Sequence, residues 1–350
     1  MRSVGAVAGV VLLAGAVLAA APAYAQSAEH EGHSMGTMPS VSLEPVPGAA
    51  PDEIVAYMCP IHSDYTAVQP GICPRDGMVL VPATPFDIRD YELDFRTVPA
   101  VPVVGEPIEL RFEVRHPGTG ERVRDFMTVH DQRYHLFVVS QDMRHFEHIH
   151  PVQDAEGIWS ITVVLPRPGH YKVLSDFVPR GGTAQFVARS LVTAGYAGDL
   201  FAESANLETD DATTKTVGGL TATLSFDPER FVAGLYGHLD YFLSDAVTGE
   251  PVTDLQIYLG AFGHTLILSE DLVDYVHSHP LDLTASFDED SGPMMFMVPM
   301  GVDPETLRGG PEITFDGLMP RAGRFRAFTQ FRWHDEIHTF AFSFEVDDAP

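Results

Sequence analysis

The chain of 350 residues contains only two cysteines, Cys59 and Cys73, and none after position 73. A blue-copper site needs a cysteine ligand on a β-barrel, so the long C-terminal part of the chain cannot form one. The sequence also lacks a nucleophile elbow, a glycine-rich phosphate-binding loop and an H-E-x-x-H helix. We therefore expect no enzyme; a metal-water hydrolase or an oxidase at an open three-histidine site is the enzymatic alternative.

Basic residues are scarce. Lysine and arginine number 21 against 49 acidic residues, which gives a formal net charge of −28. A surface of this sign repels nucleic acid and anionic lipid and concentrates cations around the protein. No nucleic-acid partner is expected. The charge agrees with cation binding without proving it, and solubility or adaptation to salty surroundings is the favoured explanation.

Long apolar runs are confined to the N-terminus. Arg2 precedes the apolar run Val10–Ala21, and Ala23-Tyr24-Ala25 forms an A-x-A cleavage site. This arrangement is typical of a secretory signal peptide. No later stretch approaches the ~18 residues that span a bilayer. The sequence predicts a signal peptide over residues 1–25, cleavage near Ala25, no membrane anchor, and a periplasmic or secreted protein.

Residues 51–86 contain two short turns with the same spacing of possible metal ligands. Cys59 and His62 are separated by two residues, and so are Cys73 and Asp76. Two such turns can supply four ligands to one ion. A disulfide between Cys59 and Cys73 is the alternative, because such bonds persist outside the cytoplasm.

This segment resembles the heavy-metal-binding domain of bacterial envelope proteins. The resemblance covers Cys59-Pro60-Ile61-His62, then Pro70-Gly71-Ile72-Cys73-Pro74-Arg75-Asp76-Gly77-Met78, and the closing Leu80-Val81-Pro82. It implies a small metal-binding knuckle. The family often has a third cysteine where this chain has Asp76, and a carboxylate shifts the preference away from the softest ions.

The rest of the chain predicts β-structure. Ile108, Leu110, Phe112 and Val114 alternate with charged residues, as in a half-buried strand, and similar short runs recur between turn signals. Residues 104–151 align without a gap with residues 233–280, and about a quarter of these positions are identical. The prediction is therefore a mostly-β protein with two homologous immunoglobulin-like β-sandwiches. We assign them to residues 87–197 and 220–350, joined by a linker over 198–219.

Three histidines recur in both copies. His135, His148 and His150 align with His264, His277 and His279. Residues i and i+2 of a strand share a face. A reverse turn centred on Asp142-Met143 places His135 opposite His150, on that same face. The aligned turn at Asp271-Leu272 does the same for His264 and His279.

Three imidazoles on adjacent strands can hold one Cu(II) or Zn(II) and leave a fourth position open. Asp176 is a candidate for that position, and its aligned counterpart, Gln330, is a poorer ligand. The alternative is that these histidines are structural. The candidate metal ligands are Cys59, His62, Cys73, Asp76, His135, His148, His150, His264, His277 and His279.

Two other segments contain soft donor atoms. Residues 26–50 predict a flexible tail containing His30, His33, Met35 and Met38, and a further group comprises Met294, Met295, Met297 and Met300. Imidazole and thioether groups suit copper in either oxidation state. A plain linker and a hydrophobic loop are the respective alternatives.

The β-region resembles two-module immunoglobulin-like secreted bacterial proteins with an HxHP turn, which here are His148–Pro151 and His277–Pro280. The leading hypothesis is a periplasmic heavy-metal-binding protein that handles copper, or zinc, by binding and transfer or in resistance. Its expected partners are the metal ion and a metal efflux or delivery protein of the cell envelope. The alternative is a structural or interaction protein of immunoglobulin-like modules with a disulfide-closed N-terminal cap.

Overall fold

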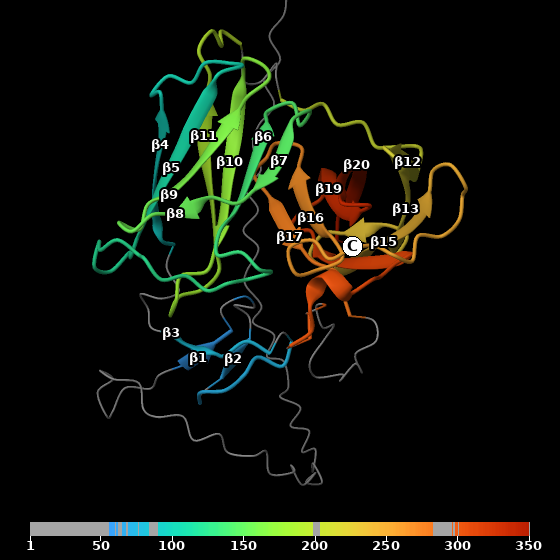
Figure 1. Ribbon diagram of the computed structural model, residues 1–350, viewed down its shortest axis with the longest axis horizontal. Coiled ribbons are helices and arrows are strands. Elements are labelled where there is room, and N and C mark those ends of the chain that lie inside the picture. The colour runs from blue at the N-terminus through green and yellow to red at the C-terminus, as the bar shows by residue number, and fades with distance from the viewer. Residues whose placement is uncertain are drawn as a thin grey trace, which may run out of the picture. The chain divides into compact units, whose positions relative to one another are not determined.

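In the computed structural model, β-strands are the main regular element of the described residues (Figure 1). In the part that the structure describes, one 3-10 helix, η1 (Pro304–Thr306), accompanies the strands, and no helix is long and apolar enough to cross a membrane. The mostly-β prediction is confirmed. The described residues are 56–59, 61, 65–67, 69–75, 77–83, 90–198, 204–282, 296, 298–299 and 301–349.

The N-terminal part of the described chain is a small three-stranded sheet of order β2-β1-β3. Cys59, Cys73 and Leu80 are buried together beside it. Two backbone hydrogen bonds, from Cys73 N to Met78 O and from Gly77 N to Cys73 O, close the second turn of this segment. The strands are β1 (Ala56–Met58), β2 (Thr66–Ala67) and β3 (Val81–Ala83).

The first β-sandwich consists of two four-stranded sheets of order β4-β5-β9-β8 and β11-β10-β6-β7. The alternation predicted around Ile108 is confirmed, because Ile108, Leu110, Phe112 and Val114 of β5 are all fully buried between these sheets. The strands are β4 (Glu92–Val98), β5 (Pro107–Arg115), β6 (His135–Ser140), β7 (Phe146–Ile149), β8 (Val152–Gln153), β9 (Trp159–Val164), β10 (His170–Phe177) and β11 (Gln185–Val192).

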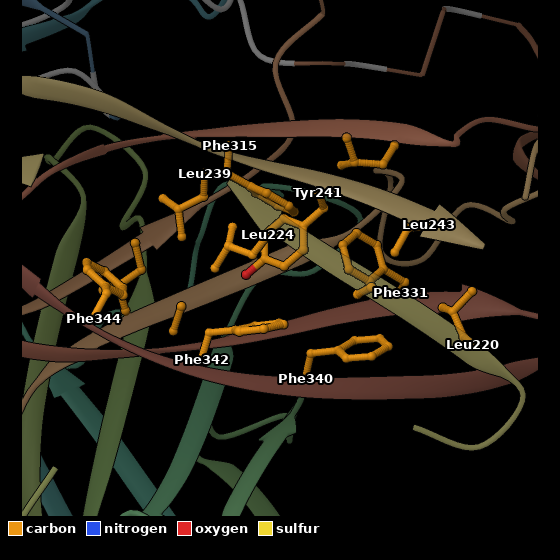
Figure 2. Packing of buried hydrophobic residues seen from close by; sticks show 14 of the residues in the cluster. Leu220, Leu224, Leu239, Tyr241, Leu243, Phe315, Phe331, Phe340, Phe342 and Phe344 are labelled. Carbon is orange, nitrogen blue, oxygen red and sulfur yellow. The ribbon is translucent and has the colours of Figure 1, made fainter. Parts of the chain in front are cut away.

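The second β-sandwich repeats this plan with sheets of order β12-β13-β15-β18 and β14-β20-β19-β16-β17. Its core is aromatic: Figure 2 shows Tyr241 close to Phe331, and the Tyr241 hydroxyl hydrogen-bonds to Thr329 Oγ1 at 2.7 Å. The strands are β12 (Thr214–Val217), β13 (Leu220–Asp227), β14 (Phe231–Val232), β15 (Tyr236–Asp245), β16 (His264–Ser269), β17 (Tyr275–Ser278), β18 (Glu312–Leu318), β19 (Gly323–Trp333) and β20 (Glu336–Asp347).

The two sandwiches share a third hydrophobic cluster. Strands β6 and β16 are buried on both faces, because one face of each lines its own core and the other meets the partner sandwich. The rings of Phe146 and Phe328 stack across this contact with centroids 4.4 Å apart. Ala205 and Leu207 also join the cluster, and β12 lies within the residues expected as a linker.

The β6–β7 and β16–β17 turns are built alike, which accounts for the serine and aspartate identities of the repeat. Ser140 Oγ accepts from His145 N at 2.9 Å, and Ser269 Oγ accepts from Asp274 N at 2.8 Å. Met143 and Leu272, with φ of 51° and 56°, occupy equivalent left-handed positions. Because both turns are fixed in this way, the register of the strands that follow them is also fixed.

Candidate metal centre

The turns bring each set of three histidines together. Leu136 pairs with Ile149 and Phe137 with His148, which is the register predicted from a turn at Asp142-Met143. In the second sandwich Thr265 pairs with Ser278 and Leu266 with His277, again as predicted. One potential ligand atom from each member lies within 4.8 Å of the others in both sets. We call His135, His148 and His150 the first triad, and His264, His277 and His279 the second triad.

In the first triad the nitrogens converge closely. His135 Nδ1 lies 3.1 Å from His148 Nε2 and 3.3 Å from His150 Nε2. Nitrogens bound to one tetrahedral ion at ~2.0–2.1 Å are about 3.3 Å apart from one another. The spacing of these atoms therefore matches a single coordination sphere.

Backbone carbonyls fix the tautomer of the first histidine in each triad. His135 Nε2 donates to Val129 O at 3.1 Å, and His264 Nε2 donates to Tyr258 O at 2.8 Å. A carbonyl oxygen can only accept, so the proton of each neutral ring is on Nε2. The lone pair is consequently on Nδ1, the atom that faces the other members of the triad.

The middle histidines are held by side chains from the opposite sandwich. His148 Nδ1 donates to Gln330 Oε1 of β19 at 3.0 Å, and His277 Nδ1 donates to Asp176 Oδ2 of β10 at 2.6 Å. These bonds leave the Nε2 lone pairs directed at the triads. Asp176 was expected as a fourth ligand of the first triad. That expectation is corrected, because its carboxylate binds the outer nitrogen of His277 instead.

Several inward nitrogens lack a hydrogen-bond donor. His264 Nδ1, His277 Nε2 and His279 Nε2 are buried and have no hydrogen-bond partner among the described residues. In the first triad, His135 Nδ1 and His148 Nε2 face each other as two acceptors. Buried acceptors without a donor cost about 1–3 kcal/mol each. A cation that accepts several lone pairs at once fits both triads.

Burial favours the neutral form of five triad histidines: His135, His148, His150, His264 and His279. Burial lowers the pKa of His135 to about 4, with a further contribution from His277, and burial together with His135 lowers the pKa of His150 to about 3. Burial and neighbouring histidines hold the pKa of His148, His264 and His279 well below the ordinary value. Imidazole binds metal only when it is neutral, so the sites are ready to bind at neutral pH.

The two triads meet at the contact between the sandwiches. Ring centroids are 5.3 Å apart for His135 and His277 and 5.6 Å apart for His148 and His264. These separations lie in the same range as those within a triad, such as 5.4 Å for His135 and His148. The six imidazoles therefore form one cluster.

A cavity of about 220 Å³ leads to part of this cluster. Its walls include His130, His135, Asp176, His277 and His279. A larger hollow of about 860 Å³ lies at the other end of β6 and includes none of the six histidines. The smaller cavity thus gives access to the candidate centre.

A sequence family matches both sandwiches. The family described as "Domain of unknown function (DUF8832)" covers residues 88–194 and 215–348, which is more than half of the chain. The chain belongs to the DUF8832 family. Both histidine triads of this DUF8832 protein lie within the matched residues. No protein of curated function matches the sequence.

Solved structures similar to this DUF8832 chain include bacterial adhesins. The match to FdeC, an Escherichia coli adhesin, has 12% identity, 78% coverage of this chain, 68% coverage of that chain and a TM-score of 0.24. For the Yersinia pseudotuberculosis adhesin InvE the values are 10%, 73%, 60% and 0.20. A match to invasin, a bacterial integrin-binding protein, has 12% identity, coverages of 74% and 40%, and a TM-score of 0.19. At such TM-scores the likeness carries no argument about function.

The ligands expected in the N-terminal segment of this DUF8832 protein are only partly described. Cys59 and Cys73 are fully buried in the small sheet domain, whereas His62 and Asp76 lie outside the described residues. The tail over 26–50 and the four methionines Met294, Met295, Met297 and Met300 also lie outside them. The knuckle and the methionine sites stay predictions.

Sequence reasoning missed two features of the cluster. One is that Asp176 and Gln330 each hydrogen-bond to a histidine of the other sandwich. An alignment of the two repeats does not show which residues of one copy contact the other. The other is His130, whose ring stacks on that of His279 with centroids 3.5 Å apart. His130 aligns with Leu259, so the histidine pattern of the repeat could not reveal it.

Proposed function

We propose that this DUF8832 protein binds transition-metal ions at its two histidine triads, with Cu(II) and Zn(II) as the favoured ions. The observation that supports the proposal is the convergence of three imidazoles in each triad, with the outer nitrogens of His135, His148, His264 and His277 occupied by hydrogen bonds. Three nitrogen ligands with a fourth position open suit these two ions. Handling of copper or zinc outside the cytoplasm, with transfer to an envelope efflux or delivery protein, is the role we infer.

The proposal is tested by counting bound ions. Residues 26–350 are titrated with Zn(II) and with Cu(II), and bound metal is measured after gel filtration. We expect replacement of His148 and His150 by Ala to remove the first-triad ion, and replacement of His277 and His279 by Ala to remove the second. His238→Ala, on β15 in the opposite sheet of the second sandwich, is the matched control and should retain both ions.

An ion held by the Cys59–Cys73 segment would be common to all these variants, so it does not obscure the comparison. The proposal fails if the wild type and both double variants bind the same number of ions with the same affinity. The second candidate is then a structural or interaction protein made of immunoglobulin-like modules.

A further inference from the structure

The outer hydrogen-bond partners break the symmetry of the cluster at one position. The carbonyls of Val129 and Tyr258 are equivalent in the two copies and bind equivalent histidines. Asp176 and Gln330 are also equivalent, since Asp176 pairs with His135 across β10 and β6, and Gln330 with His264 across β19 and β16. One is a carboxylate and the other a neutral amide. The triads therefore differ in the charge of one outer partner.

The charged and the neutral outer partner each act across the contact between the sandwiches. Asp176 lies beside the first triad in the sheet but hydrogen-bonds to His277 of the second. Gln330 lies beside the second triad but hydrogen-bonds to His148 of the first. Each sandwich thus supplies the outer partner for a ligand of the other.

A carboxylate on the outer nitrogen changes how well an imidazole binds a metal. It draws the Nδ1 proton toward itself, which makes Nε2 a stronger donor, and it fixes the ring in the binding tautomer. Its negative charge also offsets part of the cost of burying a dication. An amide oxygen fixes the ring but supplies no charge. Only the second triad has the carboxylate.

We propose that the two triads form one paired centre with unequal affinities, in which Asp176 makes the second triad the tighter site and Gln330 keeps the first the weaker. Asp176 and Gln330 act as positioning residues, each for the triad of the opposite sandwich. The inference rests on the proposed function and adds to it an order of filling. The ion in the second triad is bound first and released last.

The test measures each triad separately. His150→Ala leaves the second triad intact, and His279→Ala leaves the first intact. Zn(II) and Cu(II) affinities are measured by competition with a chelator, using the full chain from residue 26. Asp176→Asn is added to each background, and Asp125→Asn, an exposed aspartate of the same sandwich, is the matched control.

We expect Asp176→Asn to weaken metal binding by about 10–100-fold in the His150→Ala background, because outer-partner changes have effects of that size. In the His279→Ala background the weakening should be much smaller, because Asp176 neighbours His135 in the sheet but hydrogen-bonds to His277. Gln330→Glu should tighten the first triad in the His279→Ala background. A merely structural role of these side chains would give no gain of affinity.

Equal weakening by Asp176→Asn in both backgrounds, or weakening in neither, overturns the inference while ion binding itself stands. Tighter binding at the first triad than at the second in the unsubstituted backgrounds also overturns it. Absence of any ion from both triads instead contradicts the proposed function and removes the basis of the inference.

Discussion

At the scale of single residues, the histidines of the triads are arranged for binding at the expense of stability. The outer nitrogens of four of them donate to Val129 O, Tyr258 O, Gln330 and Asp176. In the second triad, one nitrogen of each ring is buried without a hydrogen-bond partner among the described residues. Without a cation, a buried apolar side chain at one of these positions would be the more stable choice.

Replacement of His279 by Leu tests this. His279 is only 6% exposed and its Nε2 lacks a partner among the described residues. In the presence of a chelator we expect the His279→Leu variant to have a higher melting temperature than the wild type. The corresponding gain in the free energy of unfolding is about 1 kcal/mol. With excess Zn(II) the order should reverse, because only the wild type gains binding energy at the second triad.

Differential scanning calorimetry in chelator and in excess Zn(II) gives the melting temperatures of the wild type and the variant under both conditions. A wild-type chain that is the more stable of the two in chelator would contradict the interpretation of the inner nitrogens as unsatisfied. His238→Leu serves as the control for a histidine-to-leucine change outside the cluster.

At the scale of strands, the same sheet faces hold the triads and the contact between sandwiches. Residues i and i+2 share a face, so Phe328 and Gln330 of β19 point the same way, as do Leu174 and Asp176 of β10. The apolar members pack in the shared cluster, and the polar members reach the histidines. Packing of these faces therefore positions the exchanged hydrogen bonds.

Phe328→Ala should cost about 3–5 kcal/mol of stability, as is usual for a buried phenylalanine. It should also weaken metal binding at both triads, because the sandwiches lose a ring stacked across their contact. Phe342→Ala removes an equally buried ring from the other face of the same sheet and should cost similar stability without weakening the metal sites. Urea unfolding and metal competition, compared for the two variants, check this. Equal metal affinities would contradict it.

The strands show which parts of the structure a sequence can predict. The alternation in β5 and the turns at Asp142-Met143 and Asp271-Leu272 predicted burial and register correctly, because both depend on local periodicity and turn position. The burial of β6 on both faces depends on a partner far along the chain. The same holds for the bond between Asp176 and His277, so local reasoning assigned Asp176 to the wrong triad.

At the scale of the whole molecule, the buried histidines couple folding to pH. The folded-state pKa values of His135, His148, His150, His264 and His279 lie below the ordinary value, with His135 at about 4 and His150 at about 3. Between these values and about 6.5 the unfolded chain binds more protons than the folded chain. Stability of the metal-free protein must therefore fall as the pH is lowered through this window.

We expect the melting temperature of the metal-free protein to drop between pH 6.5 and pH 4, measured by circular dichroism in chelator. The double variant His135→Gln and His150→Gln should show a shallower drop, because two of the groups that take up protons on unfolding are gone. A melting temperature that rises as the pH falls through this window would contradict the depressed pKa values.

The exchange of outer partners has a consequence for work with fragments. A chain divided between the sandwiches would yield two halves that each retain three imidazoles, yet each would lack the acceptor that orients its middle ring. Metal affinities measured on the separate halves would therefore differ from the affinities of the same triads in the intact protein. A chimera that combines one sandwich of this chain with the other sandwich of a relative would likewise have to keep both hydrogen bonds, His148 to Gln330 and His277 to Asp176.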